Sequence, residues 1–205
     1  MVERSQWVEI TDEDPTHSQR YIERFRTMAE AGRDLAGEAR LIDAMAPRSA
    51  RILDAGCGPG RVGSTLAELG HEVVGVDVDP VLIAEAQREH PGATWLVGDL
   101  AELDLPAAGV AADYDVIVCA GNVMTFLAPS TRSLVVSRLG AHLADGGRLV
   151  VGFGAERGYP FDEFRDNAEA AGLVLDLEVS TWDLRPFGEE SEFLISVLSR
   201  PASSD

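Results

Sequence analysis

Residues Ile52–Gly63 read ILDAGCGPGRVG, and no other segment carries as much information about the fold. Residues 51–55 have the composition of a short buried strand, and glycines at 56, 58 and 60 follow it at once. A glycine-rich turn between a strand and a helix lets the backbone approach a ligand closely, with the free N–H groups of the helix pointing at it. We therefore predict a ligand site at this turn, outside the carboxyl end of a sheet strand.

Outward from this turn, short apolar strands alternate with helices. Further strands are predicted at 72–76, 94–97, 114–119 and 148–153, and helices at 16–31, 35–45, 63–69, 80–89, 130–143 and 161–171. Two extended stretches, 173–182 and 192–200, end the chain, and the segment between them is too short for a helical crossover. The expected fold is α/β: a doubly wound, mostly parallel seven-stranded sheet with helices on both faces and an antiparallel C-terminal strand.

The length of 205 residues, 45% of them hydrophobic, suits a single domain with one core. Within residues 1–205 we expect an N-terminal helical lid over 1–48, an α/β core over 49–200 and a tail over 201–205. The first predicted helix follows about fifteen polar residues. The N-terminal residues lack the apolar segment of a secretory signal, and the scarce cysteines suit a reducing compartment, so a cytoplasmic location is expected.

The charge of the chain is strongly negative: 17 basic residues, all arginine, stand against 35 acidic ones, for a net charge of -18. Without lysine the chain can form neither a Walker-A phosphate loop nor a lysine Schiff base. This charge disfavours phosphate backbones and anionic lipids, so we expect no nucleic acid and no membrane partner. The two cysteines and four histidines show no metal-ligand spacing, so no metal site is predicted.

The glycines fit two classes of cofactor. Gly58–Gly63 satisfies G-x-G-x-x-G, the dinucleotide fingerprint of an NAD(P)-dependent oxidoreductase. Gly56–Gly60, preceded by Asp54, instead resembles the first motif of the class I S-adenosylmethionine-dependent methyltransferases, an acid followed by G-x-G-x-G. The register favours the methyltransferase interpretation, because a dinucleotide site would start its glycines directly after the strand.

Two acids downstream extend the resemblance. Asp77 ends the strand VVGVD, where a carboxylate can accept hydrogen bonds from the ribose hydroxyls of either cofactor. Asp99, in LVGDL, stands where the methyltransferase family places an acid near the adenine amino group. Each has a plainer alternative: a solvated acid in the turn before Pro80, and a cap for a helix beginning at Ala101. The resemblance covers about residues 50–153, with the core motifs in order.

The resemblance implies S-adenosylmethionine as cofactor and a set of residues that bind it. These are Asp54, Gly56, Cys57, Gly58, Gly60, Asp77, Val78, Asp99, Leu100, Ala120 and Asn122. Candidates for contact with the acceptor are Tyr21, Met124, Arg157 and Tyr159. Methyl transfer from a sulfonium is an in-line displacement, in which alignment and exclusion of water matter most, and no catalytic base is assigned.

The fourth predicted strand is followed by AGNV rather than by an N-P-P-Y or D-P-P-Y tetrad, which disfavours nucleic-acid and glutamine targets. The sequence therefore predicts a methyltransferase that acts on a small-molecule acceptor. The alternatives are an NAD(P)-dependent oxidoreductase and a protein that binds S-adenosylmethionine without turnover. Cys57 and Cys119 end or follow neighbouring strands of the family's sheet, and we predict that their thiols lie close together at the floor of the pocket.

Overall fold

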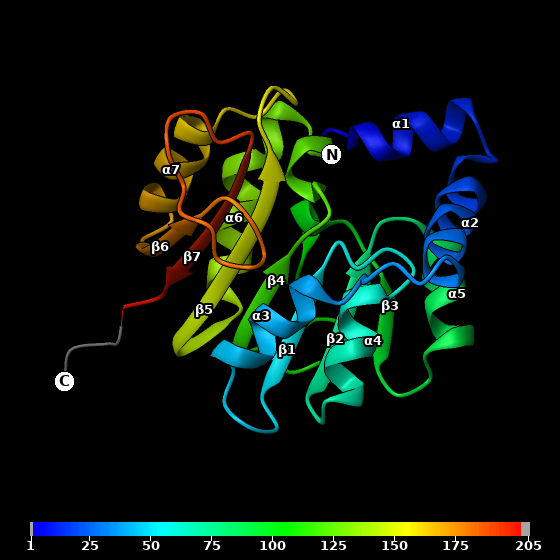
Figure 1. The fold of residues 1–205 in the computed structure, drawn as a ribbon. Helices are drawn as coiled ribbons and strands as arrows, with labels where there is room; N and C mark the ends of the chain where they lie inside the picture. Colours follow the sequence, from blue (N-terminus) through cyan, green and yellow to red (C-terminus); the bar gives the residue numbers. More distant parts are fainter. Residues whose placement is uncertain (1, 202–205) are drawn as a thin grey trace.

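A seven-stranded sheet runs through the computed structural model, which describes residues 2–201 (Figure 1). The strands are β1 (Arg51–Ala55), β2 (Glu72–Asp77), β3 (Thr94–Val97), β4 (Tyr114–Cys119), β5 (Leu143–Gly154), β6 (Val174–Val179) and β7 (Phe193–Ser199). Their order is β3-β2-β1-β4-β5-β7-β6. The first five of these positions are parallel, and β7 is antiparallel to both β5 and β6. The predicted mostly parallel sheet with an antiparallel C-terminal strand is confirmed.

Helices cover both faces of the sheet (Figure 1). They are α1 (Gln6–Glu13), α2 (His17–Glu30), α3 (Gly37–Met45), α4 (Arg61–Glu68), α5 (Pro80–Glu89), α6 (Arg132–Ala141) and α7 (Phe161–Ala170), with short 3-10 helices η1 (Leu100–Glu102), η2 (Val123–Phe126) and η3 (Pro129–Thr131). Side chains of α3 and α4 pack on one face, and those of α6 and α7 on the other. The α5 helix packs against β2 and β3.

The central strands carry apolar side chains on both of their faces because both faces of the sheet are covered. In β1, Ile52 lies in the cluster formed with α3 and α4, whereas Leu53 lies in the cluster formed with α6 and α7. Both side chains are fully buried, and burial of one such side chain contributes about 1.5–3 kcal/mol. Alternate side chains of β1 therefore pack into the cores on the two faces of the sheet. In β4, Val116 and Ile117 follow the same pattern.

The strand order reverses beside β1. From β1 the chain moves through β2 to β3 at one edge, and then returns to β4 on the other side of β1. In open α/β sheets ligands bind in the crevice outside the carboxyl ends of the strands at such a reversal. The glycine loop follows β1, and the segment containing Asn122 follows β4, so the topology brings these two loops to the same crevice.

The structure departs from the sequence-based prediction at two places. The first helix is α1, within the segment predicted to carry none; its N-cap is Ser5, and Trp7 is its one buried residue. A single buried side chain in eight residues gives too little periodicity to reveal a helix. Strand β5 begins at Leu143 rather than 148: the glycines 146 and 147 do not end a helix but lie within the strand, in the register irregularity between the pairs Tyr114–Leu143 and Val116–Arg148.

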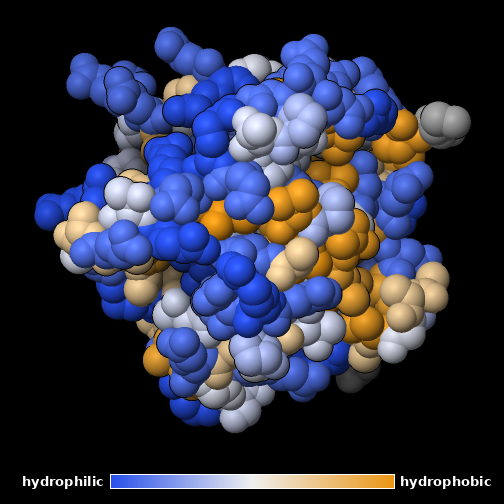
Figure 2. All heavy atoms as spheres, turned by 90° about the vertical axis from the view of Figure 1, so that its right-hand side faces the viewer, coloured by the Kyte–Doolittle hydropathy of each residue, from blue (hydrophilic) through white to orange (hydrophobic). Residues whose placement is uncertain are grey.

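The three helices within residues 1–48 do not form one lid but lie at two separate places on the molecule. The predicted lid over residues 1–48 includes α3, but α3 packs on the sheet through Ala39, Leu41 and Ile42. At the β3 side of the molecule α2 packs against α5, and α1 leads into α2 across the top of the view (Figure 1). On that side, apolar side chains gather in a band within a mostly hydrophilic surface (Figure 2). The predicted tail, apart from Pro201, lies outside the described residues.

Candidate active site

A cleft of two adjoining cavities lies at the carboxyl ends of the parallel strands. The first holds about 600 Å³ of open space and the second about 400 Å³. The two share the residues Tyr21, Gly56, Gly58, Gly121 and Val123 as lining, so they form one continuous cleft. Among the predicted cofactor residues, all but Gly60 and Asn122 line it: Asp54, Gly56, Cys57, Gly58, Asp77, Val78, Asp99, Leu100 and Ala120.

The glycine loop needs glycine at its first position for both space and conformation. Gly56 has φ +77°, in the left-handed region that side chains disfavour. A Cβ built at Gly56 would lie only 2.4 Å from Cγ2 of Val123, which closes over the loop from the other side of the cleft. At Gly58, whose φ is +55°, the nearest neighbour of a Cβ would be the ring of Tyr21 at 3.7 Å. The loop thus sits directly between η2 and α2.

Gly60 also has a left-handed φ, of +87°, and in addition its size is limited by an indole ring. A Cβ at Gly60 or Gly63 would lie 2.9 Å from Cη2 of Trp95, and one at Gly75 would lie 2.3 Å from its Cε3. Trp95 is buried and its Nε1–H donates to the backbone carbonyl of His90 at 2.8 Å. The structure therefore gives Gly60 a packing reason that does not involve a ligand.

Two buried carboxylates brace the glycine loop. Asp54 Oδ2 accepts a hydrogen bond from the backbone N–H of Gly63 at 2.8 Å, and Asp77 Oδ2 accepts one from that of Gly58 at 2.8 Å. The other oxygen of Asp77 accepts from the backbone N–H of Asp79 at 2.9 Å. Burial raises the pKa of Asp54 to about 7 and that of Asp77 to about 6, although these backbone hydrogen bonds favour the ionised forms.

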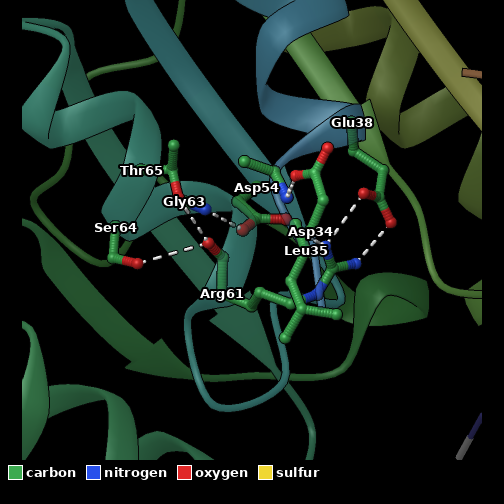
Figure 3. A network of polar contacts seen from close by, with 9 residues as sticks. Asp34, Leu35, Glu38, Asp54, Arg61, Gly63, Ser64 and Thr65 are labelled. Atoms are coloured by element: carbon green, nitrogen blue, oxygen red, sulfur yellow. Dashed lines mark hydrogen bonds and ion pairs between the residues drawn. The ribbon is translucent and has the colours of Figure 1, made fainter. Parts of the chain in front are cut away.

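An ion pair from α3 holds the start of α4 beside the cleft (Figure 3). The guanidinium of Arg61 donates to both carboxylate oxygens of Glu38 and to the carbonyl of Leu35, and it lies 5.4 Å from the ring centre of Phe25. Arg61 and Phe25 line the second cavity. Neither Arg61 nor Glu38 was predicted to belong to the site; the position of Arg61, directly after the third glycine, is the only local signal for it.

Asp99 and Asn122 both bond to backbone. Asp99 lines the first cavity while its Oδ1 accepts from the N–H of Ala101 at 2.8 Å, so it also caps η1. Asn122 adopts φ +67°, and its Oδ1 accepts from the N–H of Gly154 at 2.8 Å. That bond ties the loop after β4 to the end of β5, beside the cleft rather than in its lining.

The structure places the four candidate acceptor residues differently. Tyr21 lies in the cleft, at the junction of the two cavities. Met124 is fully buried, with its sulfur 3.7 Å from that of Cys119. Tyr159 is 1% exposed, its hydroxyl accepts from the Asn167 side chain, and it stacks on Phe153. Met124 and Tyr159 are thus core residues and line neither cavity.

The fourth candidate, Arg157, is exposed in the loop after β5. Its Nε lies 3.0 Å from the position of a Cβ built at Gly154, so the side chain folds back over the end of β5. Of the two cysteines, Cys57 lines the second cavity and packs with Trp95, whereas Cys119 lines neither cavity and packs with Met124, so only Cys57 lies at the pocket wall; the closeness of the two thiols stays a prediction. Within residues 2–201 no group of three or more potential metal ligands occurs.

The N-terminal helices contribute residues to the cleft that were not predicted to lie there. Ser5 and Trp7 line the first cavity together with Phe126 of η2. Trp7 reaches the side chain of Asp79, the N-cap of α5, through a hydrogen bond that spans 72 positions. The only sequence signal at this point is the acid before Pro80, which is typical of a helix N-terminus.

The chain is similar to known proteins of one family. The model of a methyltransferase domain matches residues 52–147. A TehB-like S-adenosylmethionine-dependent methyltransferase from Corynebacterium glutamicum has a crystal structure with TM-score 0.87 and 49% identity; the match covers 91% of this chain and 100% of that one.

Two curated relatives match over a smaller part. An uncharacterised methyltransferase of Mycobacterium tuberculosis is 35% identical over 114 residues, 54% of each chain. The trans-aconitate 2-methyltransferase of Azoarcus sp. is 33% identical over 135 residues, 65% of this chain and 48% of the relative. The chain thus matches about half the length of these curated relatives. Because the Corynebacterium protein is matched over its whole length, the chain belongs to the S-adenosylmethionine-dependent methyltransferases, and S-adenosylmethionine is its cofactor.

Proposed function

We propose that the protein transfers a methyl group from S-adenosylmethionine to a small-molecule acceptor. The observation that carries this proposal is the single cleft that gathers the acid of β1, the glycine loop, the acid of β2 and the acid after β3 at the reversal of strand order. The cytoplasmic location and the absence of nucleic-acid and membrane partners stay predictions. None of the helices within the described part of the chain is long and apolar enough to cross a membrane.

The lining of the two cavities fits the two ends of this cofactor. The first cavity combines Val78 and Leu100, suited to the faces of an adenine ring, with the carboxylates of Asp77 and Asp99. The second lies against the glycine loop and Ala120, where backbone can approach the methionine end closely. At Gly121, which lines both cavities, a Cβ would meet no atom within 4 Å, so the cleft wall is open at this position.

The residues of the cleft have defined tasks in this scheme. The cofactor supplies a methyl group on a positively charged sulfur. Asp77 accepts hydrogen bonds from the ribose hydroxyls, and Asp54 and Asp77 together give the cleft a negative potential that favours a cation. Tyr21 covers the junction of the two cavities and excludes water from it. The acceptor enters from the side of Asn122 and Arg157, and the protein aligns it with the methyl group.

The raised pKa of Asp77 predicts that cofactor affinity depends on pH. Only the ionised carboxylate can accept from both ribose hydroxyls, so the ligand binds the deprotonated protein better. With a pKa of about 6 in the unliganded protein, the contribution of Asp77 to affinity should be constant above pH 7 and fall about tenfold per pH unit below 6. Calorimetric titration with S-adenosylhomocysteine from pH 5 to 8 measures this. An affinity that is flat over that range would contradict the role given to Asp77.

A methyl-transfer screen tests the function itself. Radiolabelled S-adenosylmethionine is incubated with the protein and panels of acceptors, and both labelled product and S-adenosylhomocysteine are measured. Di- and tricarboxylic acids form the first panel, because trans-aconitate is the substrate named for the Azoarcus relative; amines, phenols and thiols follow. Acceptor-dependent turnover supports the proposal. Tight cofactor binding without turnover on any panel would favour the non-catalytic alternative.

A further inference from the structure

The carboxylate of Asp79 joins three helices at one point. It is 5% exposed and stands at the N-cap of α5, where its Oδ1 accepts from the backbone N–H groups of Val81 at 2.8 Å and Leu82 at 3.4 Å. Its Oδ2 accepts from the indole N–H of Trp7 in α1 at 2.8 Å and from the hydroxyl of Ser18 in α2 at 2.5 Å. Capping α5 requires only the first oxygen. The second oxygen is therefore committed to the N-terminal helices.

Trp7 carries most of the attachment of α1. It is the one buried residue of that helix, and its ring meets those of His17, Tyr21 and Phe126 edge-on, with centroid separations of 5.0, 5.2 and 5.3 Å. The same ring lines the first cavity of the cleft. A helix with a single buried side chain opens more readily than the core does, because few buried contacts resist its detachment. The position of α1 thus depends on what holds Trp7.

The carboxylate that holds Trp7 is connected to the one proposed to bind ribose. The backbone N–H of Asp79 donates to Asp77 Oδ1, and Asp77 Oδ2 accepts from Gly58 in the glycine loop. Tyr21, from α2, lies against Gly58 from above and touches Trp7 edge-on. The turn from Asp77 to Asp79 is therefore hydrogen-bonded both to the glycine loop and to the N-terminal helices. A ligand bound between the loop and these helices would contact both.

We propose that Asp79 is a positioning residue for the cofactor. Its two hydrogen bonds through Oδ2, from Trp7 and Ser18, hold α1 and α2 over the adenosine end of the cleft; we call these two bonds the latch. The cofactor enters and leaves the cleft when the latch opens. The inference rests on the proposed function for its ligand, but the latch itself is a property of the unliganded protein.

The variant Asp79→Asn separates the latch from the helix cap. An asparagine can keep its oxygen toward Val81 and Leu82, but its amide nitrogen cannot accept from Trp7. Trp7→Phe removes the donor and keeps an aromatic ring. Asp145→Asn is the matched control, since Asp145 is exposed and lies in β5, away from the cleft lining. S-adenosylhomocysteine should dissociate at least tenfold faster from both latch variants, measured by stopped-flow fluorescence, and at the wild-type rate from the control.

Amide hydrogen exchange of the unliganded proteins gives a readout that a simple cap would not move. In Asp79→Asn, exchange should accelerate over Gln6–Glu13 and the first turn of α2, while the amides of Val81 and Leu82 keep their protection. Faster exchange confined to α5, with an unchanged dissociation rate, would overturn the latch. Failure of the wild type to bind S-adenosylhomocysteine would instead count against the proposed function, and the exchange pattern would still test the latch.

Discussion

Asp77→Ala is expected to abolish the thermal stabilisation of the protein by S-adenosylhomocysteine. At a hundred times its dissociation constant a ligand stabilises the wild type by roughly 2.7 kcal/mol, which corresponds to about 5–10 °C for a domain of this size. The variant loses the acceptor for the ribose hydroxyls and also the acceptor for Gly58 N–H and Asp79 N–H, so the loop and the ligand lose their partner together. Differential scanning fluorimetry with and without ligand measures the shift.

Two further variants keep this result interpretable. Asp77→Asn preserves the shape of the side chain and one acceptor, and it should weaken binding at least tenfold without removing it. Asp145→Ala, at an exposed position of β5, should keep the full wild-type shift. If Asp77→Ala shows the same ligand-induced shift as the wild type, Asp77 does not belong to the cofactor site.

Trp95→Ala should lower the free energy of unfolding by about 3–5 kcal/mol, as expected for a buried tryptophan replaced by alanine. The indole fills the space that Gly60, Gly63 and Gly75 leave free, and no neighbouring side chain can expand into all three positions. The change also removes the hydrogen bond to the His90 carbonyl. Urea denaturation followed by circular dichroism measures the loss. Because Gly60 rests on this ring, cofactor affinity should fall as well.

Trp182→Ala provides the comparison. Trp182 also packs against a glycine, with its Cζ2 2.5 Å from the position of a Cβ at Gly152, but it is only partly buried and lines neither cavity of the cleft. Its replacement should destabilise the protein less than Trp95→Ala does and should leave cofactor affinity unchanged. Equal losses of stability in the two variants would contradict the view that the three glycines are small in order to house Trp95.

The parallel part of the fold could be predicted because it depends on local patterns. Strands β3 and β4 and helix α5 begin and end at the predicted residues, since an apolar run or a proline-led helix marks each of them. The glycine loop could be located for the same reason: positive φ angles leave glycine as the residue of choice. Asp54, Asp77 and Asp99 line the cleft because the carboxyl ends of parallel strands meet at one edge.

The features of the site that could not be predicted from the sequence depend on contacts between segments far apart in the chain. The bond from Trp7 to Asp79 spans 72 positions, and no local pattern links an isolated tryptophan to a capping acid. Tyr159 follows β5 as an acceptor-binding residue would, but Phe153 and Phe164 draw its ring into the core. Gly60 fits a ligand motif equally well whether a cofactor or an indole occupies the space beside it, and only the packing of Trp95 distinguishes the two.

Calorimetric titration of the wild-type protein with S-adenosylhomocysteine, and separately with NAD, tests the central claim most directly. The cleft is proposed to hold one S-adenosylmethionine, so the titration should saturate at one S-adenosylhomocysteine per chain, and NAD should give no heat of binding. Prior addition of S-adenosylmethionine should remove the signal by competition. Saturable binding of NAD with no binding of S-adenosylhomocysteine would contradict the account.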